Sequence, residues 1–251
     1  MELTGKRALV TGAGTDGIGR AVAKTLSGAG AQVAVHHLNN PTEAEALVRD
    51  ITRNGGSAHC LQADFRDPDA ARHVVRDATA VMGGLDIVVH CAATLARVPF
   101  LEIDDTEWDR VHAVNLRGAF CIGQEAARAM LENADGGRIV FVSSVNQDHP
   151  TLHLAHYVAS KGGVRMLARA MAQELADKAI TVNLIAPGTV ETDLNRAALA
   201  DPAFRQAKLD LIPMRRIAMP DEIAGAALYL SGPSAGYITG TTITVDGGLT
   251  L

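Results

Sequence analysis

The 251-residue chain is poor in cysteine, and its few thiols are not spaced like a covalent or metal-bound framework. Cys60, Cys91 and Cys121 form an odd set with unrelated separations. Disulfide scaffolds and zinc sites use regular cysteine spacings, whereas proteins kept in a reducing compartment carry free thiols. We therefore expect no disulfide, no bound metal and a cytoplasmic location.

An excess of positive charge and long apolar runs are also absent. The formal net charge is −5, whereas nucleic-acid-binding proteins usually present a basic face. No apolar run approaches the ~20 residues that a transmembrane helix needs, and residues 1–12 are typical of a first strand rather than of a signal peptide. These absences argue against nucleic acid and membranes as partners and favour a small-molecule substrate.

What the chain does contain is a regular alternation of apolar runs with helical patterns. The expected strands are Arg7–Thr11, Gln32–His37, Ser57–Gln62, Leu85–His90, Arg138–Val142, Ile180–Ile185 and Thr242–Val245. The expected helices are Gly17–Ala29, Pro41–Asn54, Pro68–Met82, Thr106–Asn133, His156–Lys178 and Pro220–Leu230. This alternation predicts right-handed βαβ crossovers. We expect an α/β protein with a single domain over residues 1–251: a Rossmann-type doubly wound parallel β-sheet of about seven strands, with helices on both faces.

The stretch after the sixth expected strand departs from this alternation. Residues 189–219 hold several charges and two internal prolines. A long insertion at the carboxyl end of a strand is where a ligand lid is expected. Together with the turn that precedes it, residues 186–219 are predicted to form a substrate lid.

A glycine-rich turn, TGAGTDGIGR, follows the first expected strand over residues 11–20. Glycines let the backbone turn tightly and approach a pyrophosphate, which then rests on the amino end of the next helix. The turn therefore predicts a dinucleotide site. Its expected contacts are Gly12, Asp16, Gly17, Ile18 and Gly19.

The end of the second expected strand, AVHHLNN, bears on the choice of nucleotide. An acid there would bind the ribose 2′-hydroxyl of NAD, and a nearby arginine would accept the 2′-phosphate of NADP, but the chain has neither. His37 stands where the acid is expected, which favours NADP(H) over NAD(H), although the charge of Asp16 acts in the opposite direction. Asp64, followed by Phe65, is placed either to accept a hydrogen bond from adenine or to serve as an acid at the start of the helix at Pro68.

Tyr157 and Lys161 lie four residues apart in HYVASKGG, and Ser144 stands 13 residues before the tyrosine. In a helix this spacing places the phenol and the ammonium on one face. A phenol with an ordinary pKa near ~10 is a poor acid or base at neutral pH, and an adjacent ammonium favours its ionised form. A hydroxyl from another element can then hold a substrate oxygen beside the phenol. Such a set performs general acid–base chemistry at a carbonyl or an alcohol.

In this order and over nearly the whole chain, these motifs resemble the short-chain dehydrogenase/reductase family. The turn resembles the family's Thr-Gly-x-x-x-Gly-x-Gly with one extra residue. The segment His90-Cys91-Ala92-Ala93 replaces the family's Asn-Asn-Ala-Gly, so we expect a change in how that strand end is braced. The residues that match the family's catalytic tetrad are Asn115, Ser144, Tyr157 and Lys161.

The resemblance implies a role for each of these four residues. Tyr157 would be the general acid/base, and Ser144 would orient and polarise the substrate oxygen. Lys161 would hold the nicotinamide ribose and lower the pKa of the phenol, and Asn115 would hold a water that links Lys161 to solvent. Further cofactor contacts are implied for Ala92, Pro187, Gly188, Val190 and Thr192.

The carboxyl half resembles the glucose 1-dehydrogenase and related aldose dehydrogenase branch of the family. The polar residues expected to face a hydroxyl-rich substrate are Asn146, Gln147, Asp148, His149, His153, Glu191 and Asn195. We expect hydride transfer between nicotinamide and a carbonyl or secondary alcohol, with the anomeric carbon of a sugar favoured. A 3-oxoacyl-carrier-protein reductase and a non-catalytic nucleotide-binding protein remain the alternatives.

The two longest expected helices, over residues 106–133 and 156–178, carry small and apolar residues on more than one face. The residues expected on the additional faces are Ala119, Ala126, Ala127, Met130, Val164, Leu167, Ala168 and Met171. A helix with two apolar faces needs a second surface to cover it. The resemblance implies that these helices pair with their copies across a two-fold axis and that residues 240–251 meet another partner, which gives a homotetramer.

Overall fold

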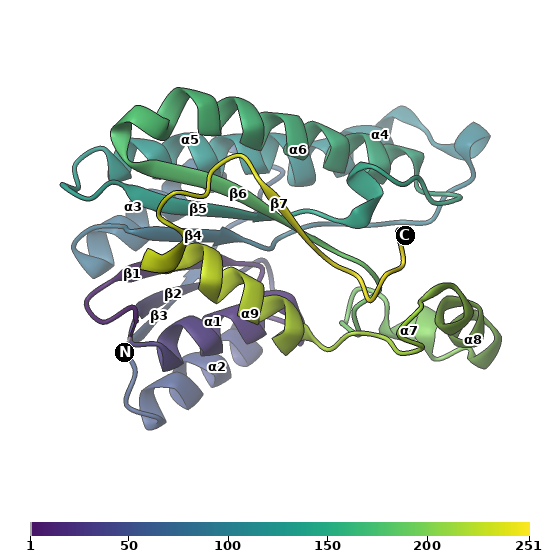
Figure 1. Cartoon of the computed structure of the whole chain (residues 1–251), viewed down its shortest axis with the longest axis horizontal. Coiled ribbons are helices and arrows are strands. Elements are labelled where there is room, and N and C mark those ends of the chain that lie inside the picture. Colours follow the sequence, from purple (N-terminus) through teal and green to yellow (C-terminus); the bar gives the residue numbers. More distant parts are fainter. Residues whose placement is uncertain (1) are drawn as a thin grey trace.

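The apolar runs form one parallel sheet in the computed structural model, which describes residues 2–251. Its strands are β1 (Arg7–Thr11), β2 (Gln32–His37), β3 (Ala58–Gln62), β4 (Ile87–His90), β5 (Gly137–Val142), β6 (Ile180–Pro187) and β7 (Thr242–Val245). They lie in the order β3-β2-β1-β4-β5-β6-β7, and every neighbouring pair is parallel (Figure 1). The predicted parallel sheet is therefore confirmed.

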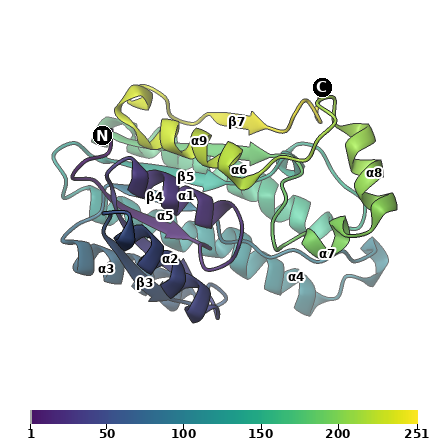
Figure 2. The same ribbon diagram turned by 90° about the horizontal axis from the view of Figure 1, so that it is seen from below.

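Helices cover both faces of this sheet. They are α1 (Ile18–Gly28), α2 (Pro41–Arg53), α3 (Pro68–Met82), α4 (Asp105–His112), α5 (Gly118–Met130), α6 (Ala155–Leu175), α7 (Arg196–Leu199), α8 (Pro202–Leu211) and α9 (Pro220–Ser231). α1, α2 and α9 pack on one face, and α3, α5 and α6 pack on the other (Figure 1 and Figure 2). The doubly wound arrangement is thus confirmed. Within residues 2–251, no helix is long and apolar enough to cross a bilayer.

The apolar character of the strands follows from this cover. Successive side chains of a strand point to opposite faces of a sheet, so a strand between two helical layers is apolar at every position. In β1, Ala8 and Val10 belong to the core beneath α1 and α9, whereas Leu9 belongs to the core beneath α3 and α5. Every residue of β4 and of β6 is buried.

The helix predicted over residues 106–133 is not uniform. A π-helical segment, Ala113–Arg117, separates α4 from α5. Hydrogen bonds in a π-helix span five residues, which widens the turn, and such segments are frequent at functional sites. Asn115 lies in this segment and bonds to the backbone of Thr94. The irregularity thus accompanies a tertiary contact that helical periodicity does not reveal.

The segment predicted as a lid is partly helical. It contains α7 and α8, which Figure 1 shows beyond the three layers at one end of the molecule. The Asp201 side chain caps α8 by accepting a hydrogen bond from the backbone of Ala203. An isolated parallel bridge between Val190 and Ala218 ties the two ends of the segment together.

The residues expected to form additional apolar faces lie mostly in the core, so that expectation was wrong. Their side chains pack beneath α3, α5 and α6 on one face of the sheet, with six of them buried and two partly buried: Ala119, Ala126, Ala127, Met130, Val164 and Ala168, then Leu167 and Met171. One protomer covers them because neighbouring helices and the sheet meet there. Other apolar side chains of these helices are exposed: Trp108, Phe120, Leu131 and Met166.

Candidate active site

Two adjoining cavities open where the carboxyl ends of the strands meet. The sheet order reverses between β1 and β4, which is where parallel α/β sheets bind ligands. One cavity, of about 580 Å³, is lined by the glycine-rich turn and the ends of β2, β3 and β4; we call it the turn cavity. The other, of about 370 Å³, is lined by Ser144, Tyr157 and the lid; we call it the lid cavity. Ile18 and Thr192 line both. A third cavity lies at the opposite, amino-terminal ends of β1 and β2, remote from these residues.

Most residues predicted to contact a cofactor come together here. Those of the turn cavity are Gly12, Asp16, Gly17, Ile18, Gly19, His37, Asp64, Phe65, Ala92 and Thr192. Those of the lid cavity are Pro187, Gly188, Val190, Thr192 and Tyr157. Asn115 and Lys161 lie beneath the cavities rather than in their walls, at 1% and 3% exposure. A dinucleotide laid across both cavities would contact residues from six separate segments.

Two glycines of the turn differ in what requires them. A Cβ at Gly19 would lie 2.4 Å from the carbonyl oxygen of Gly12, so the protein's own backbone excludes a side chain there. A Cβ at Gly17 would be in ordinary contact with Thr192 at 3.6 Å, and the backbone of Gly17 is extended. No part of residues 2–251 therefore requires glycine at position 17. It also precedes α1 without a side-chain cap, which leaves the helix N–H groups open to an anion such as a pyrophosphate.

One residue of the turn, Asp16, connects it to the lid. Asp16 pairs with Arg196 at 2.8 Å, and its N–H donates to the Asp193 carboxylate at 2.8 Å. The N–H of Asp193 returns a hydrogen bond to the carbonyl of Asp16. The turn thus docks on the segment that leads into α7, and Arg196 is shared between Asp16 and Asp193, so it offsets only part of the negative charge that they bring to the turn cavity.

The departure at residues 90–93 leaves the end of β4 firmly braced, because Thr11 performs this task. Its Oγ1 accepts hydrogen bonds from the N–H groups of Cys91 and Ala92 at 3.1 and 3.2 Å. With its lone pairs engaged, the hydroxyl donates its own proton to His90 Nδ1 at 2.9 Å. Burial lowers the pKa of His90 to about 3, aided by the charge of Lys161, so the imidazole is neutral. Burial also raises the pKa of Cys91 to about 12, which keeps it a thiol.

His36, which belongs to none of the predicted motifs, fixes the conformation of the turn. Its Nδ1 accepts a hydrogen bond from the N–H of Gly12 at 3.1 Å, and its Nε2 donates to the carbonyl of Ala63 at 3.1 Å. The ring stacks on Phe65 with centroids 4.3 Å apart. Burial lowers the pKa of His36 to about 4 and maintains this neutral tautomer. The signal in the sequence was a second histidine beside His37 at the end of a strand that is otherwise apolar.

His37 and Asp64, the two polar residues predicted to contact the adenosine half of the cofactor, have distinct environments. His37 is buried, and its Nδ1 has no hydrogen-bond partner within residues 2–251. The Asp64 carboxylate accepts from the Arg66 side chain, with Nη2 at 2.5 Å. Asp67, rather than Asp64, caps α3, so the expectation of Asp64 as a helix-start acid was wrong. Asp64 still lines the turn cavity, with its charge engaged by Arg66.

Three groups of the predicted tetrad converge from two elements. Tyr157 and Lys161 lie on the same face of α6, with the Lys161 Nζ 5.6 Å from the centre of the Tyr157 ring, as the spacing predicted. Ser144 follows β5 and forms a hydrogen bond with the phenol. The N–H of Asn146 donates to Ser144 Oγ at 3.1 Å and fixes its position.

Burial sets the protonation of these groups, contrary to the expectation that Lys161 lowers the pKa of the phenol. Burial raises the pKa of Tyr157 to about 12, while the hydrogen bond with Ser144 acts in the opposite direction. Burial lowers the pKa of Lys161 to about 8. The ammonium donates to the carbonyl of Val142 at 3.1 Å, so it is turned toward the backbone of β5. At neutral pH the phenol therefore carries its proton.

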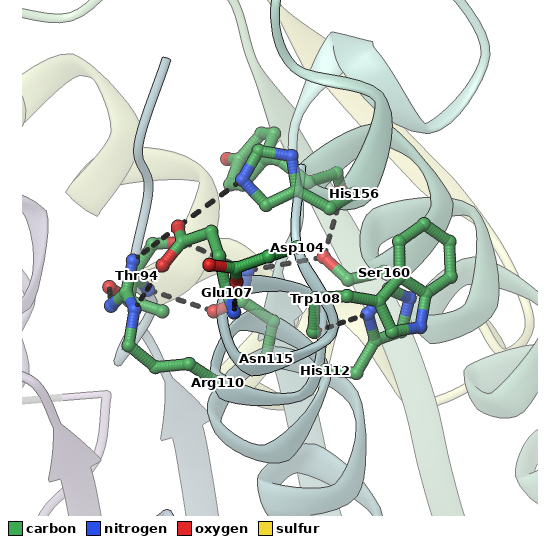
Figure 3. A network of polar contacts seen from close by, with 10 residues as sticks. Thr94, Asp104, Glu107, Trp108, Arg110, His112, Asn115, His156 and Ser160 are labelled. Carbon is green, nitrogen blue, oxygen red and sulfur yellow. Dashed lines mark hydrogen bonds and ion pairs between the residues drawn. The ribbon is translucent and has the colours of Figure 1, made fainter. Parts of the chain in front are cut away.

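Asn115 holds the loop after β4 against α6. Its Oδ1 accepts from the N–H of Thr94 at 2.8 Å, and its Nδ2 donates to the carbonyl of Thr94 at 3.0 Å and to Ser160 Oγ at 3.1 Å (Figure 3). Ser160 in turn donates to the carbonyl of Tyr157 at 2.7 Å. The amide thus positions the backbone that carries the phenol.

A second branch of the same network reaches the residue that precedes the phenol. Arg110 donates to Thr94 Oγ1 at 2.5 Å and makes two hydrogen bonds to Glu107, each 2.7 Å long (Figure 3). The Glu107 carboxylate lies 3.4 Å from Nε2 of the fully buried His156. Polar contacts therefore surround the start of α6 and connect it to the loop after β4.

This arrangement defines a class of enzyme. The turn cavity offers glycine backbone and open helix N–H groups to a pyrophosphate, and a hydroxyl and a protonated phenol meet in the adjoining lid cavity. A bound nicotinamide supplies the hydride chemistry. Groups placed in this way serve an oxidoreductase that interconverts an alcohol and a carbonyl.

Comparison with known proteins identifies the family. A family model described as "Enoyl-(Acyl carrier protein) reductase" matches residues 12–250. The 3beta-hydroxysteroid dehydrogenase 1 of Eggerthella lenta is 38% identical over 100% of this chain and 95% of that protein. Glucose 1-dehydrogenase 2 of Bacillus subtilis is 36% identical over 100% of this chain and 96% of its own length. The crystal structure of a 3-oxoacyl (acyl-carrier-protein) reductase from Agrobacterium tumefaciens with NADP bound has a TM-score of 0.93 at 33% identity, covering 98% of this chain and 95% of that one.

The chain belongs to the short-chain dehydrogenase/reductase family. It is an NAD(P)-dependent oxidoreductase that transfers a hydride between nicotinamide and a carbonyl or secondary alcohol. The names of these relatives span a steroid, a sugar and an acyl thioester. Membership in the family therefore establishes the reaction but not the substrate, which depends on the residues of the lid cavity.

The contrast between Gly17 and Gly19 is testable. Gly17→Ala should leave thermal stability close to that of the wild type and weaken nucleotide binding by about tenfold or more, because its methyl group enters the space where a pyrophosphate approaches. Gly19→Ala should cost about 1–3 kcal/mol of stability through overpacking against Gly12. Thermal denaturation together with a fluorescence titration of the nucleotide measures both effects. Unchanged nucleotide affinity in Gly17→Ala would show that the pyrophosphate lies elsewhere.

Proposed function

We propose that the protein acts on a polyhydroxylated small molecule of the sugar type, with the anomeric carbon of an aldose as the favoured centre. The polar lining of the lid cavity around the phenol carries this proposal. Ser144, Asn146, Thr151 and Asn195 all line it, and a hydroxyl-rich substrate needs such donors and acceptors. The relationship to glucose 1-dehydrogenase 2 supports the same class.

The polar loop contributes less to the cavity than its sequence suggested. Of the residues expected to face the substrate, Asn146 and Asn195 line the lid cavity, whereas the others do not: Gln147, Asp148, His149, His153 and Glu191. Asp148 pairs with Arg165 at 2.7 Å, and Glu191 pairs with Arg205 at 3.2 Å. These two carboxylates therefore form ion pairs on the loop and on the lid, outside the lid cavity.

In the proposed reaction, the role of each residue follows from its position. Ser144 Oγ holds the substrate oxygen, and the Tyr157 hydroxyl exchanges a proton with that same oxygen. Asn115 and Ser160 keep the backbone of α6 in place beneath the phenol, and Lys161 supplies positive charge next to it. For the Asn115 side chain, this is a positioning role through Thr94 and Ser160.

A second candidate is the reduction of a 3-oxoacyl thioester, favoured by the apolar part of the same cavity. Leu95, Leu154, Leu199 and Phe204 line it, and they would suit an acyl chain better than a sugar. The related 3-oxoacyl (acyl-carrier-protein) reductase supports this alternative. A sugar needs polar side chains around the part of the substrate that lies away from the phenol, whereas an acyl chain needs apolar ones.

A substrate panel combined with a Tyr157 variant tests the proposal. Aldoses, polyols, small ketones and an acetoacetyl thioester are supplied with either nucleotide, and the nicotinamide absorbance is followed. We expect an aldose or polyol to give the highest kcat/KM. Tyr157→Phe should then lower kcat by about 10²–10⁴-fold while nucleotide affinity changes little, because the phenol transfers the proton. Tyr229→Phe, on the remote helix α9, is the control. Preference for the thioester, or a fully active Tyr157→Phe, would contradict the proposal.

We infer that the protein prefers NADP(H). His37 leaves the end of β2 without a carboxylate, and Arg196, which also pairs with Asp193, offsets part of the charge of Asp16. Arg66 also lines the turn cavity, although Asp64 engages it. These features reduce the repulsion that a 2′-phosphate would meet in an NAD-specific site.

The His37→Asp variant tests this preference. A carboxylate at the end of β2 should raise the Kd of NADPH relative to that of NADH by about tenfold or more, through repulsion of the 2′-phosphate. His37→Asn removes the imidazole without adding charge and is the matched control. Fluorescence titrations of the wild type and both variants with both reduced nucleotides give the six dissociation constants required. A wild-type protein that already favours NADH by a wide margin would refute the inference.

We propose further that the protein is a cytoplasmic homotetramer. Exposed apolar side chains of the α4–α5 and α6 helices, Trp108, Phe120 and Met166 among them, would be covered by copies of the same helices across a two-fold axis. Tyr237 and Leu251, both fully exposed near the carboxyl end, would meet a second copy. The three free cysteines suit a reducing compartment.

Light scattering coupled to gel filtration measures the assembly. We expect a species of about four times the 26.3 kDa chain at micromolar concentration, because a tetramer covers both sets of exposed apolar side chains. Phe120→Glu should shift the population toward smaller species without loss of secondary structure. A stable and active 26.3 kDa monomer in the wild type would exclude the tetramer.

A further inference from the structure

Two cations from distant parts of the chain meet in the wall of the lid cavity. Arg97 lies in the loop after β4, and Lys208 lies on α8 of the lid; both line the cavity that contains Ser144 and Tyr157. Each packs on the ring of Phe204, with Arg97 Cζ 5.4 Å and Lys208 Nζ 5.5 Å from the ring centre. The lid therefore brings the two charges to one place.

Neither cation is neutralised by the protein. Within residues 2–251, Arg97 and Lys208 make no ion pair and no side-chain hydrogen bond, whereas Arg205, one turn earlier on α8, pairs with Glu191. No aspartate or glutamate is among the residues that line the lid cavity. In a chain with 28 acidic residues and a net charge of −5, this wall carries positive charge alone.

The positive charges of Arg97 and Lys208 repel one another. Burial lowers the pKa of Lys208, and the positive charge of Arg97 lowers it further. Lys208 is half-buried and Arg97 is exposed; their like charges repel one another across the cavity wall, and the face of the Phe204 ring offsets only part of that repulsion. An anion between them would relieve it.

The cofactor does not supply this anion. The predicted pyrophosphate site is at the start of α1 in the turn cavity, and neither Arg97 nor Lys208 lines that cavity. The ligand that meets the two cations therefore shares the lid cavity with the reacting oxygen.

We infer that the substrate carries an anionic group, a carboxylate or a phosphate ester, that binds between Arg97 and Lys208 while its reacting carbon lies at Ser144 and Tyr157. The inference rests on the proposed function, since it concerns the same polyhydroxylated substrate. The substrate class becomes a sugar acid or a sugar phosphate in place of a neutral sugar. A planar guanidinium suits bidentate contact with either anion, and the lysine adds a point charge.

Matched hexose derivatives test this inference. D-Glucose is the neutral reference, D-glucuronate carries a carboxylate at C6, and D-glucose 6-phosphate carries a phosphate at the same carbon. Binding of each compound is measured by calorimetry to the nucleotide-saturated Tyr157→Phe protein, in which turnover is expected to be about 10²–10⁴-fold slower. Turnover is measured separately with wild-type Tyr157.

We expect one of the two anionic compounds to bind at least about tenfold more tightly than D-glucose. Arg97→Gln and Lys208→Met, which keep side-chain bulk on Phe204, should each weaken that binding by about 10- to 100-fold, the range of a hydrogen bond to a charged group. Binding of D-glucose should change little in either variant. Arg205→Gln, which removes a charge from the same helix outside the cavity, should leave the preference for the anion intact. The tighter of the two anionic compounds identifies the group as carboxylate or phosphate.

Binding and turnover decide different questions. Equal binding of all three compounds, or an anion preference that survives both substitutions, overturns the inference, even if neutral sugars are good substrates and the proposed function holds. Tighter binding of an anionic compound that is lost in Arg97→Gln and Lys208→Met supports the anion site. If only a thioester or a simple ketone is turned over in that case, the proposed function fails while the anion site stands.

Discussion

The turn cavity and the lid cavity together form one crevice at the point where the order of the sheet reverses. This crevice depends on one hydroxyl group, that of Thr11. Beyond the last paired residues of β1 and β4, the chain leaves toward α1 on one side and toward the lid cavity on the other, and the strand ladder no longer joins them. The Thr11 oxygen accepts two N–H groups of the β4 loop and donates to His90. Leaving either of these part-buried N–H groups without a partner would cost up to about 1–3 kcal/mol. Both cavities are built on this junction.

The reacting groups show that burial can outweigh proximity. Lys161 lies on the same helix face as Tyr157, yet its ammonium bonds to the carbonyl of Val142, and the low-dielectric surroundings disfavour the phenolate. A protonated phenol is ready to give its proton to a carbonyl oxygen. Oxidation of an alcohol requires the opposite transfer, and this needs positive charge next to the phenol oxygen. The direction of proton transfer thus depends on charges in the crevice as well as on the tetrad itself.

Local patterns in the sequence predicted the elements well and predicted poorly what depends on distant contacts. The strands β1, β2 and β7 begin and end where apolar runs do, because two helical layers require apolar residues there. The spacing of Tyr157 and Lys161 was sufficient to place them on one face of α6. The π-helical segment at Asn115 was missed, since it accompanies hydrogen bonds to residues 21 and 45 positions away. For the same reason the roles of Thr11 and His36 were not foreseen, and Asp67 rather than Asp64 proved to cap α3.

The contact between the glycine-rich turn and α7 bears on how the lid moves. Asp16 and Arg196 retain 69% and 51% of their side-chain exposure, so water and salt screen their attraction. Exposed pairs of this kind contribute about 0–1 kcal/mol, which is comparable to thermal energy. Such a contact can break and re-form rapidly and cannot hold the lid shut by itself. The two hydrogen bonds between Asp16 and Asp193 and the bridge between Val190 and Ala218 also hold this segment, so loss of the ion pair alone would leave the lid docked on the turn.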